Sequence, residues 1–159
     1  MIQPEARTSE HPRISIADHQ PALLAAYSGL HRAVEMSLDK RLHELVKLRA
    51  SQINRCAFCL EMHTREGRES GLSQEKLDLL PAWRESSVFD GRERAALELT
   101  EAMTLLSCGS VPDVVWSAAS GEFNNEELAA LMMAIVTING WNRIAVTSRS
   151  SVPRRPDHA

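Results

Sequence analysis

Residues 54–63 read Asn-Arg-Cys-Ala-Phe-Cys-Leu-Glu-Met-His. The surrounding pattern predicts a helix from Arg55 to about Ser70. Each helical residue turns the chain by about 100°, so Cys56 and Cys59 would point about 60° apart, with His63 in the same sector. The stretch therefore predicts two thiols and one imidazole on the same face of a single helix.

The rest of the chain also has a helical pattern. Leu38, Leu42, Leu45 and Val46 recur at three- and four-residue steps, which is typical of an apolar helix face. Cap and stop signals delimit further helices. Asn54 and Gly71 bound the dithiol helix, and Ser73 starts a short helix that ends before Pro81. Asp90 with Glu93 precedes a helix over 95–106, Pro112 and Gly121 bound another, and Asn124 with Glu127 opens a long helix to about Thr147.

About six helices with short connections, and no alternating run of strand length, predict an all-α fold. We expect one helical bundle domain over 16–150, with loose segments at 1–15 and 151–159. The last helix is apolar on most faces between Leu128 and Ile138, so it must be covered on all sides. A neighbouring subunit could supply part of that cover, which favours a homo-oligomer.

Composition excludes several kinds of partner. The net charge of −3 and an aromatic fraction of 4% argue against nucleic acid and against an anionic membrane. The apolar run that ends at Ile138 is too short to span a bilayer. Residues 1–15 have no apolar core of the kind found in signal peptides. We therefore expect a cytoplasmic protein, in which a close cysteine pair indicates redox or metal chemistry.

The dithiol has the spacing that thiol redox chemistry requires. Only a thiolate attacks a peroxide or a disulfide, and a helix N-terminus or a nearby imidazole can generate one. Cys56 lies nearer the helix start, where the dipole contributes about 0.3–1 kcal/mol. Cys59 lies four residues before His63, and a positioned base contributes a factor of about 10²–10⁴. These magnitudes favour Cys59 as the attacking thiol and Cys56 as the resolving thiol. Glu44 is the candidate that would orient His63.

Glu44 to His63 read Glu-x11-Cys-x-x-Cys-x3-His. This spacing resembles the signature of the AhpD-like alkylhydroperoxidases within the carboxymuconolactone decarboxylase family. The resemblance covers 38–71 and continues more weakly through 80–83, 93–97 and 138–143. It implies an all-helical fold that assembles as a trimer or hexamer.

The resemblance also implies an oxidoreductase that acts on a hydroperoxide or disulfide substrate without cofactor or metal. Cys59 would attack, Cys56 would resolve, and Glu44 with His63 would form a proton relay. An external dithiol reductant, thioredoxin-like or a lipoyl protein, would restore the thiols. The family's peroxidase pattern has a histidine just before the second cysteine, where this chain has Phe58. A disulfide-reductase or redox-sensing role therefore fits the same residues.

Two other functions remain open at this point. Zinc could bind Cys56, Cys59 and His63, with Cys108 or Glu44 as the fourth ligand. A non-redox decarboxylase of the wider family is a further alternative, although the cysteine pair argues against it.

Several other residues have mainly structural interpretations. We expect Cys108 to be a lone structural cysteine in a loop, and Met132, Met133 and Trp141 to be core residues. Arg49 lies within an apolar arc and would snorkel or pair with a carboxylate. Asn139, Asn142 and Arg143 would form a buried polar network or line a pocket. No partner at motif spacing accompanies His11, His19, His31 or His43.

Overall fold

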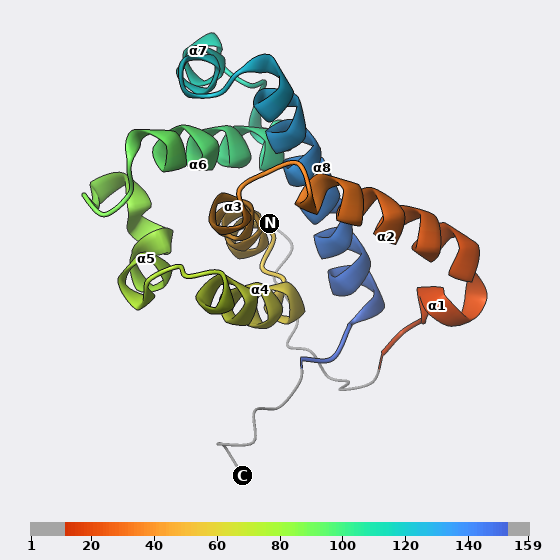
Figure 1. The fold of residues 1–159 in the computed structure, drawn as a ribbon. Coiled ribbons are helices and arrows are strands. Elements are labelled where there is room, and N and C mark those ends of the chain that lie inside the picture. Colours follow the sequence, from red (N-terminus) through yellow and green to blue (C-terminus); the bar gives the residue numbers. More distant parts are fainter. Residues whose placement is uncertain (1–11, 153–159) are drawn as a thin grey trace.

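The computed structural model describes residues 12–152, and within that range the protein is helical with no strand (Figure 1). The elements in chain order are α1 (Ile16–His19), α2 (Pro21–Glu35), α3 (Lys40–Ile53), α4 (Ala57–Glu69), α5 (Gln74–Leu79), the 3₁₀ helix η1 (Leu80–Glu85), α6 (Gly91–Thr104), the 3₁₀ helix η2 (Leu106–Cys108), α7 (Asp113–Glu122) and α8 (Asn125–Ser148). The predicted all-α fold is confirmed.

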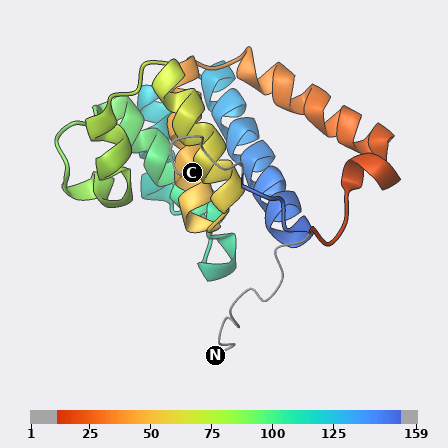
Figure 2. The ribbon, with the colours of Figure 1, turned by 90° about the horizontal axis from the view of Figure 1, so that it is seen from below.

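Helix α3 forms the centre of the bundle. It packs against α4, α6 and α8, while α2 lies along the outer side of α8 (Figures 1 and 2). The apolar face predicted for this segment is buried on two sides. Leu42 and Val46 join a core with α6, α7 and α8, and Leu45 and Leu48 join a second core with α5 and η1. Full burial of each such side chain contributes about 1.5–3 kcal/mol.

Most of the predicted helix starts are confirmed. Ser73 caps α5 by accepting from the Lys76 N–H, and Asp90–Glu93 forms a complete capping box at α6. Asn124–Glu127 forms a second complete box at α8.

The prediction that Asn54 caps the dithiol helix was wrong, because Asn54 ends α3. Cys56 takes the N-cap position of α4, and the helix itself begins at Ala57.

The long apolar helix α8 is a core helix with one uncovered face. Its length and composition would allow it to cross a membrane, but it packs within the bundle against α2, α3 and α6. Met132 and Met133 were predicted as core residues, and that prediction was wrong. Both are exposed, as is Val136.

Helix α2 has little local signal in the sequence. Val34 is the one buried residue of α2, and Leu23 is 66% exposed. The positions of apolar residues in α2 therefore do not indicate which of its side chains are buried. The loose segments predicted at 1–15 and 151–159 fall largely on residues 1–11 and 153–159, outside the described residues. Within the described part, the Arg13 N–H donates to the Ser148 carbonyl at 2.9 Å, which joins the start of the bundle to the end of α8.

Gly140 allows α2 to approach α8 closely. The Tyr27 hydroxyl donates to the Thr137 carbonyl at 2.8 Å, and its ring packs edge-on against Trp141. A Cβ atom at position 140 would overlap the Tyr27 hydroxyl. A glycine is therefore required here for the space it leaves.

We expect Gly140→Ala to destabilise the protein by about 1–3 kcal/mol, because overpacking forces the two helices apart. The free energy of unfolding in urea measures this effect. Gly121→Ala is the matched control, since a Cβ at that position meets nothing within 4 Å. The control should be neutral or slightly stabilising. Equal stability of the two variants would contradict the proposed clash.

Candidate functional site

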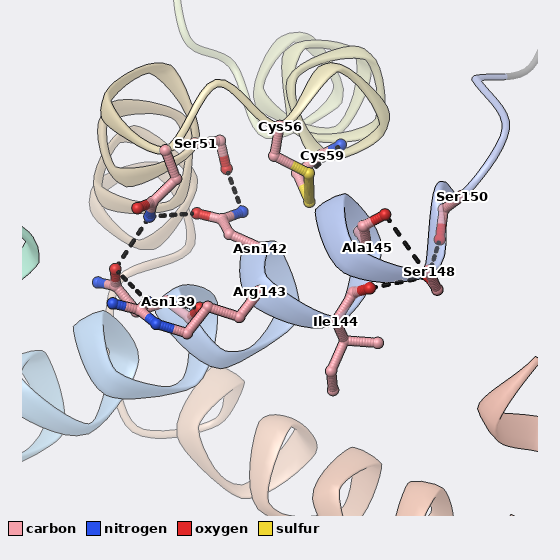
Figure 3. Close-up of a disulfide and its surroundings, with 11 residues drawn as sticks. Ser51, Cys56, Cys59, Asn139, Asn142, Arg143, Ile144, Ala145, Ser148 and Ser150 are labelled. Atoms are coloured by element: carbon pink, nitrogen blue, oxygen red, sulfur yellow. Dashed lines mark hydrogen bonds between the residues drawn. A yellow bond between two sulfur atoms is a disulfide. The ribbon is translucent and has the colours of Figure 1, made fainter. Parts of the chain in front are cut away.

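The candidate site begins at the junction between α3 and α4. Arg55 adopts a left-handed conformation with φ of 55°, and this reverses the chain between the two helices. The Asn54 side-chain amide then donates to Asn139 Oδ1 and Asn142 Oδ1, each at 2.9 Å. Asn142 in turn donates to Ser51 Oγ at 3.0 Å (Figure 3). These bonds tie the junction to α8.

The buried polar network predicted from Asn139, Asn142 and Arg143 is confirmed for the two asparagines, whereas Arg143 joins it from an exposed position. Asn139 also donates to Thr104 Oγ1 at 3.0 Å, and Arg143 donates to Asn139. Buried amides need such partners, because an unpaired one costs about 1–3 kcal/mol. The network fixes where α4 starts relative to α8.

The two cysteines form a disulfide at the start of α4, next to Ala145 of α8 (Figure 3). Their Cα atoms are 5.3 Å apart, and both side chains are buried. The Cys59 backbone N–H donates to Cys56 Sγ at 3.3 Å. Cys56 Sγ thus lies at the positive end of the helix, where a thiolate would be stabilised.

His63 lies one turn beyond Cys59, with its ring between two carboxylates. Its Nδ1 is 3.2 Å from Glu44 Oε2 and 3.1 Å from Glu66 Oε2. Both carboxylates can accept a hydrogen bond from Nδ1–H, and in that tautomer Nε2 is an acceptor. The structure therefore brings together Glu44 and His63, which the sequence could not place near each other.

The charges of this cluster are unusual for a buried position. Burial raises the pKa of the Glu44 carboxyl, but the hydrogen bond from His63 and the charge of Lys47 outweigh it, so the pKa lies below its usual range. The Lys47 ammonium is 2.7 Å from Glu44 Oε1 and is 1% exposed. Lys47 follows Glu44 by three residues and Glu66 follows His63 by three, a helical spacing that could have indicated both contacts.

A pocket of about 540 Å³ opens onto Cys59 and His63. Its mostly apolar wall comes from the start of the described chain and from three helices. The lining residues are Pro12 and residues 14–17, Leu24 and His31 of α2, Phe58 and Met62 of α4, Trp141, Ile144, Ala145 and Ser148 of α8, and Ser150 and Ser151 after α8. Trp141, predicted as core, is thus a half-buried wall of this pocket. His31, which had no partner at motif spacing, also faces the pocket.

Cys56 does not line this pocket. It borders a separate gap of about 10 Å³ beside Ala57, Ala145 and Val146. A molecule that enters the large pocket therefore meets Cys59 and not Cys56. The two cysteines therefore differ in whether they line this pocket.

The four ligands of the zinc alternative are not assembled in residues 12–152. Both sulfurs are in the disulfide, and Cys108 is exposed in η2. The potential metal ligands that cluster in this part of the chain are Glu44, His63 and Glu66, within 4.8 Å of one another and without a cysteine. The ammonium of Lys47 already supplies a positive charge there.

The fold and the site together define a class of protein: a helical bundle with a cysteine pair at a helix start, of which one cysteine lines an apolar pocket. Residues 21–102 match the sequence model of the carboxymuconolactone decarboxylase family. The chain belongs to this family, and the AhpD-like resemblance is confirmed.

Three relatives illustrate the likeness. The uncharacterised protein YdfG of Bacillus subtilis (strain 168) is 38% identical over 112 residues, which are 70% of this chain and 76% of YdfG. A solved structure from Agrobacterium tumefaciens, of unknown function and provisionally assigned as the antioxidant defence protein AhpD, has a TM-score of 0.88 at 40% identity and covers 91% of this chain and 100% of its own.

The third is an alkylhydroperoxidase AhpD core from Ralstonia eutropha JMP134, described as an uncharacterised peroxidase-related protein. It has a TM-score of 0.75 at 19% identity, with 89% of this chain and 75% of that chain covered. At that identity the likeness supports the fold alone.

The Glu66 carboxylate makes the stability of the site depend on pH. Its hydrogen bond with His63 holds the pKa of the Glu66 carboxyl below its usual range, although burial opposes the shift. The carboxylate therefore stabilises the fold above the unfolded-state pKa, and this contribution is lost as the pH falls through the folded-state pKa.

We expect the stability advantage of the wild type over Glu66→Gln to be roughly 1 kcal/mol or less above about pH 5, because the group is partly exposed. The advantage should shrink as the pH falls below that value. Urea unfolding of both proteins across the acid range measures it. A difference that stays constant with pH would contradict the assignment.

Proposed function

We propose that the protein is a thiol-dependent peroxidase or disulfide reductase in which Cys59 attacks and Cys56 resolves. One observation carries this proposal: Cys59 and His63 line the same pocket, while Cys56 is within disulfide reach of Cys59 but outside that pocket. The Nδ1 contact with buried Glu44 supports a role for His63 as the base. Family membership is compatible with this chemistry.

The proposed reaction with a hydroperoxide ROOH balances within the site. His63 Nε2 takes the proton of the Cys59 thiol, and the thiolate attacks the outer oxygen. The S–O bond forms while the O–O bond breaks, and the alkoxide takes the proton back from the imidazolium. Cys59 is then a sulfenic acid. The Cys56 thiol attacks it, a disulfide forms and water leaves.

Reduction would use an external dithiol, thioredoxin-like or lipoyl, which is itself oxidised to a disulfide. Its thiolate would attack Cys59 through the pocket, and Cys56 would leave as a thiolate. The Cys59 N–H that points at Cys56 Sγ favours this departure, because a stabilised thiolate leaves faster. A model disulfide substrate would be reduced by the reverse sequence of thiol exchanges.

The pocket favours an organic substrate. Its wall is formed mainly by apolar side chains, among them Phe58, Met62 and Ile144. Phe58 stands where the peroxidase pattern has a histidine, and it adds apolar surface beside Cys59. Burial of such surface contributes about 25 cal/mol per Å² to binding. We therefore propose a hydroperoxide or disulfide that carries an apolar group.

Assembly and location are part of the same proposal. The exposed Met132, Met133 and Val136 form an apolar face on α8 that a second copy of the chain could cover. This face supports a homo-oligomer, trimer or hexamer. A cytoplasmic location remains our expectation.

Substitution of the cysteines tests the assigned roles. Cys59→Ser should abolish consumption of an organic hydroperoxide in the presence of dithiothreitol, because no thiolate then faces the pocket. In the absence of dithiothreitol, pre-reduced Cys56→Ser should react with one equivalent of hydroperoxide and stop as a sulfenic acid on Cys59, which mass spectrometry detects as one added oxygen. Cys108→Ser, with its side chain exposed on η2, is the control and should behave as wild type. Normal turnover by Cys59→Ser would refute the proposal.

A carboxylate in the pocket wall tests the substrate class. Ile144→Asp should raise the KM for cumene hydroperoxide about tenfold or more and leave the rate with hydrogen peroxide almost unchanged, since only the organic substrate uses the apolar wall. Steady-state kinetics with both peroxides measure the effect. Val114→Asp makes the same change on the exposed side of α7 and should alter neither KM. An equal loss with both peroxides would count against the apolar site.

A further inference from the structure

Lys47 is the most deeply buried charged residue near the site. Its side chain is 1% exposed, and three carboxylates surround the ammonium: Glu44 Oε1 at 2.7 Å, Glu35 Oε1 at 3.5 Å and Glu66 Oε2 at 3.9 Å. Within the described chain, none of these contacts has the geometry of a well-aligned hydrogen bond. Burial of an ammonium is costly, and apolar side chains of similar volume often stabilise a fold as well. Stability is therefore a poor explanation for a lysine at this position.

The two oxygens of Glu44 have different partners. Oε1 faces Lys47 and Oε2 faces His63 Nδ1 at 3.2 Å. Lys47 and Glu44 lie one turn apart on α3, so the ion pair holds the carboxylate on the side of α3 that packs against α4. The orientation of the Glu44 carboxylate, and with it the site of the proton on His63, thus depends on Lys47.

We infer that Lys47 is a positioning residue for the proposed reaction: it keeps Glu44 ionised and turned toward His63, so that Nδ1 holds a proton and Nε2 remains free to take one from Cys59. The inference rests on the proposed function. Lys47 does not line the pocket, so it would act through Glu44 and His63 and not on the substrate.

Other titratable groups surround Lys47, and none of them replaces its positive charge. From α2, His31 Nε2 lies 3.3 Å from Glu35, and burial lowers the pKa of His31. From α3, burial lowers the pKa of His43 to about 3. Both rings are therefore uncharged near neutral pH. From α4, Glu66 adds a second carboxylate on His63. Arg65 of α4 also approaches Glu66, at 4.0 Å, but its side chain is 55% exposed. Lys47 is the buried basic residue in contact with Glu44.

Loss of the Lys47 charge should raise the pKa of the Glu44 carboxyl. Burial already raises the pKa of Glu44, and without the ammonium less remains to offset it. Glu44 would then take up a proton at a higher pH, and His63 would lose its acceptor there. The rate at which Cys59 reacts falls as the pH is lowered, and this fall is the acid limb of its pH–rate profile. Without the Lys47 charge, the acid limb should lie at higher pH.

The test is the rate at which iodoacetamide alkylates Cys59 in the reduced protein across pH, read by mass spectrometry, with hydroperoxide turnover measured in parallel. Lys47→Met should slow alkylation at about pH 6 by roughly tenfold, the effect of a limb displaced by one pH unit. Lys47→Arg should restore most of the rate. Lys76→Met, which removes the lysine paired with Glu93 on another part of the bundle, should leave the limb in place.

An acid limb in folded Lys47→Met that coincides with that of the wild type would overturn the inference. If Lys47→Met does not fold, Lys47→Gln provides the same comparison, because it keeps a polar side chain without the charge. A displaced limb in Lys47→Gln supports the positioning role, and an unchanged limb overturns it. Alkylation needs no turnover, so a displaced limb without hydroperoxide or disulfide turnover would refute the proposed function alone.

Discussion

The hydrogen bonds from Asn54 to Asn139 and Asn142 are the constraint on which the site depends. They hold the end of α3 against α8 at the point where Arg55 reverses the chain. Because α4 starts immediately afterwards, the same bonds fix where Cys56 caps the helix and which wall of the pocket Cys59 meets. A dithiol on an isolated helix would have the right spacing, but nothing would distinguish its two sulfurs. The buried amides supply that distinction through the position of α8.

Burial and charge cooperate around the imidazole. Cys59, His63 and Glu44 are each 3% exposed or less, and an isolated carboxylate in that environment would be neutral. The contacts with His63 and Lys47 reverse this tendency and keep the carboxylate ionised. The site can therefore exclude water and still hold a charged group beside its base. Such a combination is typical of positions where a protein moves a proton.

Much of this arrangement follows from local sequence, and the rest depends on tertiary contacts. The capping boxes at Asp90 and Asn124 are short-range signals, and the helix starts there were correctly predicted. Asn54 has the side chain of a helix cap, but its amide bonds to α8, a partner that lies 85 or more residues away.

The same division holds for the site. The spacing of Cys56, Cys59 and His63 is local, so one helix could be predicted to carry all three. The approach of His31 could not, because it depends on how α2 packs across α8 and leaves no periodic signal in the chain. Met132 and Met133 look like core residues in sequence, since composition does not reveal which side of a helix lacks a neighbour.

The pocket has walls of two origins. The stretch matched by the family, 21–102, contains both cysteines, His63 and Glu44, whereas residues 12–17 and 141–151 lie outside it and close the cavity from the two ends of the chain. The cysteines and His63 therefore lie in the family stretch, while the pocket wall combines residues of that stretch with residues of the flanking segments. A substitution in residues 12–17 or 141–151 could change the shape of the cavity without moving Cys59. The shape of this cavity can therefore differ between family members whose cysteines and histidine coincide.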